Sequence, residues 1–495
     1  MTILHYILIA LEVILIFNLI IGAHELGHFL AARWRGLKVE RFAIWFGKPI
    51  WKKKVGGVEY VLGTIPFGGY VSLPQMATME AIEGKSEETA EPLPNVAPLD
   101  KIIVAFAGPL FSFLLAIAFA FIVWGVGRPT NEADNTTTVG WVDKNGPAWN
   151  AGLRPGDSIL EVDNLPVHHF SPMSADSVTW RIVTSTGTNI PIKYVRDGKE
   201  ALAVAVPSHA VTKWYERKAL RKIQILPAGK AFIYELASNS PAAVAGLKPG
   251  DEVVALDGEK IYNFNAVFDV QESMSNGVVK PVTFSIRRGA AQFDKTLTAV
   301  KPLIPTNPPT RFEKMCGALH IPLKPMPPLE SYPMFGIMVW QTDTNETLLR
   351  PNPLDQIQAS AAQIFNTFSA LFSRKGEIGV QQLGGAVMIM RVYSNLFDDE
   401  DGWRRVLWFS VILNVNLALL NLLPLPVLDG GHITLSLIEA VRRRPVSAKI
   451  LEKIQSGFAA LLIAFMLYIA FFDTGDWIRS ARADRDVTVI FLPQK

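Results

Sequence analysis

Residues 20–28 read Ile20-Ile21-Gly22-Ala23-His24-Glu25-Leu26-Gly27-His28, and this stretch decides how the rest of the sequence is interpreted. It places a His-Glu-x-x-His motif at the end of a long apolar run. Two histidines at this spacing lie on one face of a helix, about one turn from each other. Both imidazoles can then bind one Zn²⁺, with Glu25 beside them as a candidate general base. The alternative is a helix that carries two unrelated histidines.

The apolar run from Ile3 to Ala23 is long enough to span a bilayer. It has no basic segment in front of it, so we interpret it as a retained span and not as a signal peptide. Ionisable groups at membrane depth are energetically expensive, and they are functional candidates for that reason. We interpret Glu12, in the middle of the run, as a carboxylate facing the helix bundle; a proton or water pathway to the metal is the alternative. A metal at the motif needs a third ligand from elsewhere in the chain.

The composition indicates a membrane protein with soluble parts. Of 495 residues, 49% are hydrophobic, and the mean hydropathy is +0.23. The net charge of +3 gives no reason to expect nucleic acid as a partner. The single cysteine, Cys316, excludes an intramolecular disulfide and a cysteine-based zinc site.

Three further apolar segments are predicted to span the membrane. They are Lys101–Trp124, Trp403–Leu423 and a segment with its core at Phe458–Phe472. Basic residues come after the first and third spans, which predicts that those loops are cytoplasmic and that both termini lie outside. The predicted segments are residues 1–34 (first span), 35–99 (cytoplasmic loop), 100–127 (second span), 403–432 (third span), 433–473 (cytoplasmic loop and fourth span) and 474–495 (tail).

The first cytoplasmic loop contains strand signals. Residues 41–49 and 58–73 are predicted to form a β-hairpin around the turn-like Gly56-Gly57, and the second strand contains Gly68-Gly69-Tyr70. Such a hairpin is either an ordinary membrane-surface element or an exposed edge that a substrate strand can join. Residues 79–98 are acidic and contain proline, so we interpret them as a linker without an assigned role.

The region after the second span contains a repeat. Asn145-Gly-Pro-Ala-Trp-Asn-Ala-Gly-Leu-Arg-Pro-Gly-Asp157 recurs as Asn239-Ser-Pro-Ala-Ala-Val-Ala-Gly-Leu-Lys-Pro-Gly-Asp251, 94 residues later (239 − 145). This period indicates tandem small domains, and the pattern resembles PDZ domains, predicted at residues 128–210 and 225–302. PDZ domains bind extended peptides at a sheet edge, although either copy could instead be a spacer. Residues 228–231 are a candidate carboxylate cradle in the second copy.

Residues 303–402 are interpreted as a proline-rich connector that contains one amphipathic helix. The apolar stripe over Asp355–Phe372 has helical periodicity. Such a helix lies on the membrane surface or packs on the soluble domains.

The third span runs into Asn421-Leu-Leu-Pro-Leu-Pro-Val-Leu-Asp-Gly-Gly-His432. The two prolines are expected to break the helix, and Gly430-Gly431 to loosen the backbone after the break. Non-helical backbone at membrane depth is tolerated where it lines a cavity, so Asp429 is the candidate third metal ligand. His432 is a rival for that place.

Four features together resemble the site-2 protease family of intramembrane zinc metalloproteases. They are the membrane His-Glu-x-x-His, the late Asn-x-x-Pro-x-Pro-x-Leu-Asp-Gly, the Gly-Gly-Tyr between the first two spans and the tandem PDZ-like repeats. The likeness is greatest to the bacterial regulator of sigma-E protease subgroup, with four spans and two PDZ domains. It covers essentially the whole chain. The fold class that it implies is an α-helical membrane protein with a membrane-associated β-hairpin.

The resemblance also implies roles for individual residues. His24, His28 and Asp429 would hold Zn²⁺, Glu25 would be the base, and Asn421 would bind substrate or the oxyanion. Gly68, Gly69 and Tyr70 would belong to the family's membrane-associated β-loop, and residues 355–372 to its amphipathic helix on the periplasmic face. One departure is Ser112, where the family commonly has Asn. It puts a polar role of that position in doubt.

The function implied is a zinc-dependent intramembrane endopeptidase of the bacterial inner membrane, whose PDZ domains filter substrates by size. Its substrates would be single-span membrane proteins such as an anti-sigma factor, or remnant signal peptides, met within the lipid bilayer. Two other classes fit part of the pattern: a proteolytically inactive, membrane-anchored PDZ scaffold, and a zinc transporter. Transporters usually have repeated halves, whereas the four spans here are unlike one another.

Overall fold

The structure is a computed structural model that describes residues 3–76, 96–130, 132–171, 174–275, 277–304, 331–342, 347–373, 376–399, 401–443, 448–483 and 489–492. The acidic linker, apart from its last residues, and Cys316 lie outside this part of the chain. The chain forms two compact units. The first consists of Met1–Pro129, Leu348–Phe365 and Gly384–Asp473, and the second of Thr130–Thr347, Asn366–Leu383 and Thr474–Lys495.

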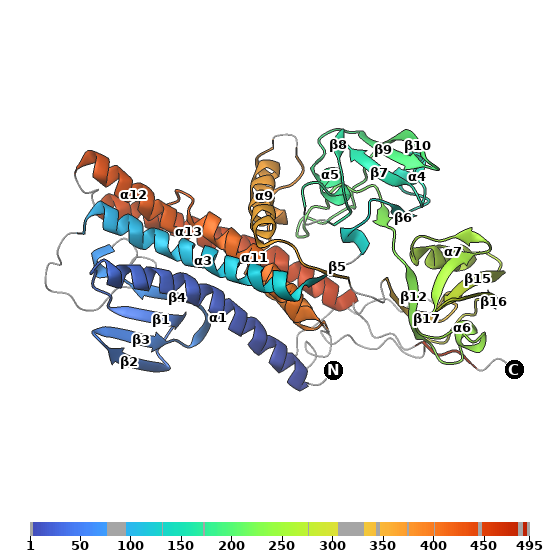
Figure 1. The fold of residues 1–495 in the computed structure, drawn as a ribbon, viewed down its shortest axis with the longest axis horizontal. Helices are drawn as coiled ribbons and strands as arrows, with labels where there is room; N and C mark the ends of the chain where they lie inside the picture. Colours follow the sequence, from blue (N-terminus) through green and yellow to red (C-terminus); the bar gives the residue numbers. More distant parts are fainter. Residues whose placement is uncertain are drawn as a thin grey trace. The chain divides into compact units, whose positions relative to one another are not determined.

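The prediction of four spans is confirmed by helices that are long and apolar enough to cross a membrane. They are α1 (Ile3–Trp34), α3 (Pro98–Val126), α11 (Gly402–Asn421) and α13 (Ala448–Ala483). Helix α3 packs against both α1 and α11 (Figure 1). The fourth span is longer than predicted, because α13 continues ten residues beyond Asp473 into the predicted tail.

Small residues bring α1 and α3 close together. A Cβ atom at Gly27 would collide with the carbonyl group of Ala107, so only glycine permits this crossing. Ala31, Ala32 and Ala105 are buried in one hydrophobic cluster to which α1, α3 and the following sheet all contribute. Close backbone approach through small residues is the usual way in which membrane helices gain packing energy.

Between α1 and α3 lies a four-stranded sheet, which corrects the predicted hairpin. Its strands are β1 (Arg41–Phe46), β2 (Trp51–Val55), β3 (Val58–Leu62) and β4 (Ile65–Ser72), in the order β2-β3-β1-β4. The turn at Gly56-Gly57 joins β2 to β3, and β1 pairs parallel to β3 and antiparallel to β4. The prediction missed β2 because its lysine-rich stretch is exposed throughout. Strand β4 is an edge strand that packs on α1.

The break after α11 is confirmed, but the backbone beyond it is not loose. Residues 422–428 separate α11 from α12 (Asp429–Arg442), a regular helix in the predicted cytoplasmic loop. Gly430 and Gly431 are buried in its first turn. A Cβ atom at either would collide with carbonyl oxygens of the preceding break, at Leu422 and Leu425 respectively. The two glycines therefore hold the helix start close against the break instead of loosening it.

The second unit contains two β domains with the same order of elements (Figure 1). The first β domain consists of β6 (Val139–Val142), α4 (Pro147–Asn150), β7 (Ser158–Val162), β8 (Leu165–Pro166), α5 (Val178–Thr184), β9 (Ile190–Arg196), β10 (Lys199–Ala205) and β11 (Ile225–Pro227). The second β domain consists of β12 (Ala231–Leu236), α6 (Pro241–Val244), β13 (Glu252–Leu256), β14 (Glu259–Lys260), α7 (Asn265–Ser275), β15 (Pro281–Arg288), β16 (Ala291–Thr298) and β17 (Ile337–Gln341).

In each β domain the last strand pairs with the first. Strand β11 pairs antiparallel with β6, and β17 pairs antiparallel with β12. The predicted domain limits therefore shift. Strand β11 belongs to the first domain, although the sequence pattern assigns it to the second, and β17 belongs to the second domain and not to the connector. A pairing between chain ends cannot be found from sequence order alone.

The repeated Gly-Leu-x-Pro-Gly-Asp sequence has a structural role in both domains. The carboxylates of Asp157 and Asp251 are buried, with 1% of each side chain exposed. Arg196 donates from Nε and Nη2 to Asp157, and Arg288 does the same to Asp251, at 2.6 and 2.7 Å in both cases. Each aspartate thus fastens the start of its strand to the end of a neighbouring one.

The remaining elements complete the chain. They are the strands β5 (Arg128–Thr130) and β18 (Thr347–Leu349), the helices α9 (Pro353–Phe372) and α10 (Ala386–Phe397), and the 3₁₀ turns Pro74–Met76, Glu132–Asp134 and Val380–Gln382. Helix α9 matches the predicted amphipathic helix. The tail returns to the second β domain: the N–H groups of Leu303 and Ile490 each donate to the other's carbonyl oxygen, at 2.8 and 2.9 Å. Phe491, 3% exposed, lies against Gly336.

Candidate metal centre

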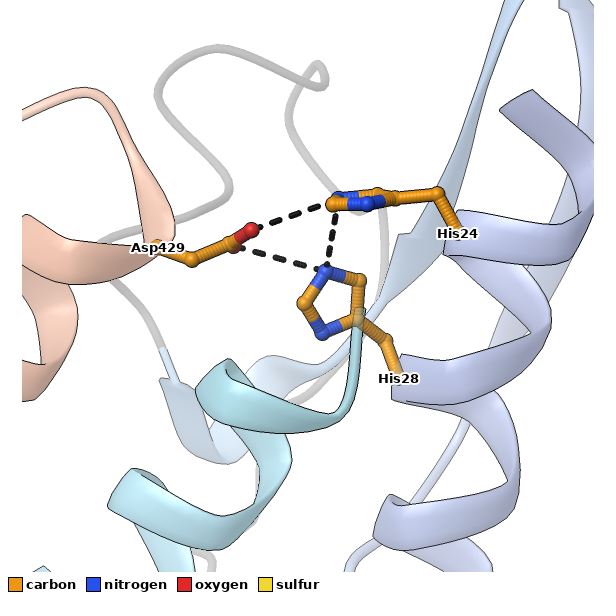
Figure 2. Close-up of side chains that lie close together, drawn as sticks. All are labelled: His24, His28 and Asp429. Atoms are coloured by element: carbon orange, nitrogen blue, oxygen red, sulfur yellow. Dashed lines mark hydrogen bonds and ion pairs between the residues drawn. The ribbon is translucent and has the colours of Figure 1, made fainter. Parts of the chain in front are cut away.

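Three side chains from two helices meet inside the first unit. His24 and His28 project from one face of α1, and Asp429 is the first residue of α12 (Figure 2). All three are buried. The break between α11 and α12 allows this meeting, because it lets a new helix begin with its carboxylate beside α1. Figure 2 shows the two imidazole rings and the carboxylate pointing toward one another.

The donor atoms of the three side chains are about as far apart as zinc ligands are. The Nε2 atoms of His24 and His28 are 3.3 Å apart. Asp429 Oδ2 lies 3.2 Å from His24 Nε2, and its Oδ1 lies 3.4 Å from His28 Nε2. Ligand atoms arranged tetrahedrally at the usual zinc distances of about 2.0–2.2 Å are about 3.3–3.6 Å apart. Among the residues that the structure describes, this is the one group of three or more such donors close enough to share an ion.

The Nδ1 atom of each imidazole makes a polar contact with a residue of α3. His28 Nδ1 donates to the carbonyl oxygen of Val104 at 2.8 Å, and His24 Nδ1 lies 3.0 Å from the hydroxyl of Ser112. Partners of this kind fix the ring orientation and tautomer of metal-binding histidines. Ser112 therefore has a polar contact with the site, although it stands where the family that the sequence resembles commonly has Asn.

The hydrogen bonds leave acceptor atoms facing acceptor atoms. A carbonyl oxygen can only accept, so His28 Nδ1 carries the hydrogen and the Nε2 of a neutral ring presents a lone pair. That lone pair faces the Asp429 carboxylate at 3.4 Å. Two acceptors in buried contact need a cation or a proton between them. The donor set, two imidazoles and one carboxylate with no thiolate, fits zinc.

A cavity of about 260 Å³ opens beside the three donors. Glu25 and Asn421 both line it, the first from α1 and the second from the last turn of α11. His432, one turn beyond Asp429 on α12, lines the same cavity but lies outside the gathered donor group. Space for a substrate backbone is therefore next to the donors, with a carboxylate and an amide on its walls.

Of the three β4 residues that were predicted to bind substrate, Gly69 lies next to this site. A Cβ atom at Gly69 would lie 3.4 Å from Glu25 Cγ, so the strand backbone passes directly beside this side chain. Gly68 has φ of +79°, and a Cβ there would collide with the ring of Phe46. The Tyr70 ring stacks on Phe46 with centroids 6.0 Å apart, and its hydroxyl accepts from Arg41 at 3.2 Å. Gly68 and Tyr70 thus shape the strand and do not line the cavity.

Sequence reasoning missed Gly108. A Cβ atom at this position of α3 would overlap the Nε2 atoms of both His28 and His24. The sequence marks this position, since Gly108 precedes Pro109 within a predicted span. No pattern in the sequence, however, relates Gly108 to the two histidines.

The interpretation of Glu12 is wrong. Its side chain is exposed on α1, on the same face as the exposed Leu8, Leu15 and Leu19, and does not face the bundle.

These features define a class of protein: a membrane-spanning metalloprotease, in which a His-Glu-x-x-His helix and an aspartate from a second helix converge between spans. The model of Peptidase family M50 matches residues 12–465. The chain therefore belongs to peptidase family M50, the site-2 protease family, and is a zinc metalloprotease of that type.

Curated relatives align over nearly the whole chain. A "Putative zinc metalloprotease" of Vibrio cholerae is 27% identical over 470 residues, covering 93% of this chain and 97% of that protein. A "Regulator of sigma E protease" of Salmonella typhi is 26% identical, covering 93% and 96%. One of the same name from Haemophilus influenzae is 25% identical, covering 92% and 96%. These names support zinc as the metal and the enzyme over the scaffold and the transporter.

Proposed function

We propose that this protein is a zinc-dependent endopeptidase that cleaves peptide bonds within transmembrane segments of single-span membrane proteins. The observation that carries the proposal is the position of the donor group. His24, His28 and Asp429 converge beside a cavity that is lined by residues of α1, α11 and α12, in a unit that contains helices long and apolar enough to span a membrane. A peptide bond that reaches this cavity must come from a segment in or next to the bilayer.

In this proposal His24, His28 and Asp429 hold the zinc ion. When bound, zinc acidifies a water ligand and polarises a carbonyl group. Glu25 would accept a proton from the attacking water and later donate it to the leaving amine. Asn421, on the cavity wall, donates a hydrogen bond to the carbonyl oxygen as negative charge develops on it. Removing one such donor typically costs about 3–4 kcal/mol of transition-state stabilisation.

The edge of β4 supplies the substrate-binding surface. A helix in the bilayer hides its peptide bonds in its own hydrogen bonds, so a transmembrane substrate must unwind before it is cleaved. A free sheet edge offers replacement hydrogen bonds to the unwound segment. Among the described residues, β4 has such an edge, and Gly69 lies beside Glu25. A substrate strand that joins β4 would pass the catalytic side chain.

We further propose that the two β domains are PDZ domains on the periplasmic side of a bacterial inner membrane and that they filter substrates by size. The predicted carboxylate cradle at residues 228–231 does not support peptide binding, because Ala228 and Gly229 donate their N–H groups to Thr138 and Tyr262. Within the part of the chain that the structure describes, β11 and β17 lie at sheet edges, and these edges are the surfaces to which a peptide would add. Relatives named for sigma-E regulation suggest an anti-sigma factor as one substrate; remnant signal peptides are another class.

The filter has its own test. A variant that lacks residues 130–342 is compared with the full chain on two substrates that share a transmembrane segment but carry a small or a large outer domain. The proposal expects the full chain to reject the large substrate and the deletion variant to cleave both. Equal selectivity of the two proteins, with the small substrate cleaved, would refute filtering.

Proteolysis is tested by the Glu25→Gln variant. Purified wild type and variant are incubated in detergent with a single-span model substrate, and the zinc content of both is determined. We expect one zinc per chain in both proteins and cleavage by wild type alone, because the amide cannot accept the proton. Full turnover by the variant would overturn the role of Glu25. Zinc-loaded wild type that cleaves none of a panel of single-span substrates would overturn the proposed function.

A further inference from the structure

Trp45 of β1 has a backbone conformation that large residues avoid. Its φ is +73°, in the left-handed region that favours glycine. The pairing of β1 with β4 shifts register here: Ile44 is opposite Gly69, and Phe46 is opposite Ile65. A strained bulky residue persists where its surroundings hold it in place, and such residues cluster at functional sites.

One contact that holds Trp45 comes from the spanning helix. The indole N–H of Trp45 donates to Asn18 Oδ1 of α1 at 2.5 Å. The Asn18 amide group in turn donates to the carbonyl oxygen of Ile14 at 2.6 Å, which directs Oδ1 outward. Both side chains are partly buried. An indole N–H or a carboxamide within the apolar region is costly unless it is paired, so each group needs the other.

Asn18 lies on the face of α1 that carries the catalytic side chain. Asn18, Ile21 and Glu25 have the i, i+3, i+7 spacing that puts residues on one helix face. Ile21 and Glu25 are the α1 side chains that flank Gly69 of β4. The bond from Trp45 to Asn18 therefore joins the sheet to the same face, about two turns before Glu25.

We propose that Trp45 and Asn18 are positioning residues that fix the register of the sheet along α1, so that the β4 edge presents a substrate segment at Glu25. This inference rests on the proposed function. The pair does not touch the reacting atoms. It acts through the sheet, at the position where the β1–β4 ladder is interrupted and could otherwise slide or tilt.

The test is a double-mutant cycle of Trp45→Phe, Asn18→Leu and the combination of both. Each single variant leaves one polar group without its partner and should lose thermal stability. The double variant removes both groups and should recover stability relative to the single variants. We expect all three to lower kcat about tenfold or more with KM little changed, because displacement of a bound substrate by about 1 Å can cost 100-fold in rate. Zinc content is measured throughout.

Trp51→Phe is the matched control. Trp51 lies on β2, at the opposite edge of the same sheet, and is exposed. Its replacement should change neither stability nor kcat. A double variant W45F/N18L that recovers both stability and wild-type kcat would refute the proposal, since the pair would then be only structural.

A second measurement does not depend on activity. Cysteines replacing Ile21 and Gly69, in a Cys316→Ser background, report whether β4 lies against α1. We expect rapid disulfide formation in the otherwise native chain and at least fivefold slower formation when W45F/N18L is added. Equal rates would overturn the register role. If the rates differ but no variant, nor the wild type, cleaves any substrate, then the proposed function fails and the positioning role stands.

Discussion

At the scale of single residues, Gly108 shows how closely α3 approaches the candidate metal centre. The absence of a side chain at this position makes room for the imidazoles of His24 and His28, while Ser112, one turn later, contacts the ring of His24. Helix α3 thus supplies both the space for the two imidazoles, at Gly108, and a hydrogen-bonding group, at Ser112. The donor group depends on α3 as well as on the two helices that carry it.

Gly108→Ala is expected to abolish zinc binding. The added methyl group would overlap the Nε2 atoms of both histidines and push the rings apart. Gly125→Ala is the matched control, because it lies on the same helix and its Cβ would meet nothing within 4 Å. Zinc content after purification checks the pair: the control should keep about one zinc per chain. Stoichiometric zinc in the Gly108→Ala variant would show that the rings can move aside.

At this scale the candidate donors follow from patterns in the sequence, but the residues that support them do not. His24, His28 and Glu25 form a local pattern, and Asp429 is marked by prolines that break a span. Gly108 and Ser112 acquire their meaning only when α3 is packed on α1. The same holds for Trp45 and Asn18, which are 27 residues apart in the sequence. Contacts between helix faces, or between a helix and a sheet, leave no regular spacing to detect.

At the scale of elements, the buried aspartate at the end of the repeated motif stabilises each β domain. In the second domain Asp251 is held by Arg288, which also donates to the carbonyl oxygen of Gly246 at 2.9 Å. Arg287, the preceding residue, pairs with Glu252 near the surface at 2.9 Å. Two adjacent arginines on β15 thus pair with carboxylates that are 1% and 12% exposed, which allows a direct comparison.

Arg288→Ala should destabilise the second β domain more than Arg287→Ala does, because it leaves the buried carboxylate of Asp251 without its cation. Arg287→Ala removes an ion pair with solvent access and should cost about 0–1 kcal/mol. Hydrogen exchange of the β13 and β15 amides in the full chain measures both values. Equal protection in the two variants would contradict the structural role of the motif.

Sequence patterns predicted the elements better than their pairing. The spans, the amphipathic helix and the repeat can be inferred from composition and periodicity. The parallel pairing of β1 with β3 and the return of β17 to β12 cannot, because they join strands that are not neighbours in the chain. The lysine-rich β2 was missed because an exposed polar strand has no apolar alternation.

At the scale of the whole molecule, the two β domains contact each other through side chains. The indole of Trp141 in β6 donates to the carboxylate of Asp269 in α7 at 3.0 Å. Burial raises the pKa of the Asp269 carboxyl group above its usual range, and the hydrogen bond from Trp141 lowers it by less. Ionisation of Asp269 is therefore less favourable in the folded state than in the unfolded chain.

Because the folded pKa of Asp269 is raised, folding gains stability as the pH falls from neutral through that pKa, and the gain is lost again as the pH rises. Asp269→Asn keeps an acceptor for Trp141 and removes the charge, so it should strengthen the contact at pH 7 and abolish this pH dependence. Hydrogen exchange of α7 and the Ala228–Gly229 amides, corrected for intrinsic rates and followed from pH 7 down to about pH 4, near the unperturbed pKa of Asp, measures both effects. Asp294→Asn, at an exposed site on β16, is the control. An Asp269→Asn variant that retains the wild-type pH dependence would contradict the assignment.

The pairing of Leu303 with Ile490 has a consequence for biosynthesis. The two residues are separated by 187 positions (490 − 303), and the last span lies between them. At a synthesis rate of about 5–20 residues per second, the place that Phe491 fills stays open for about 10–40 s after Leu303 has been made. The second β domain is then complete only once the chain has inserted its fourth helix. A nascent chain that stalls in this helix would leave the place of Phe491 beside Gly336 uncovered, so the second β domain would stay unfinished.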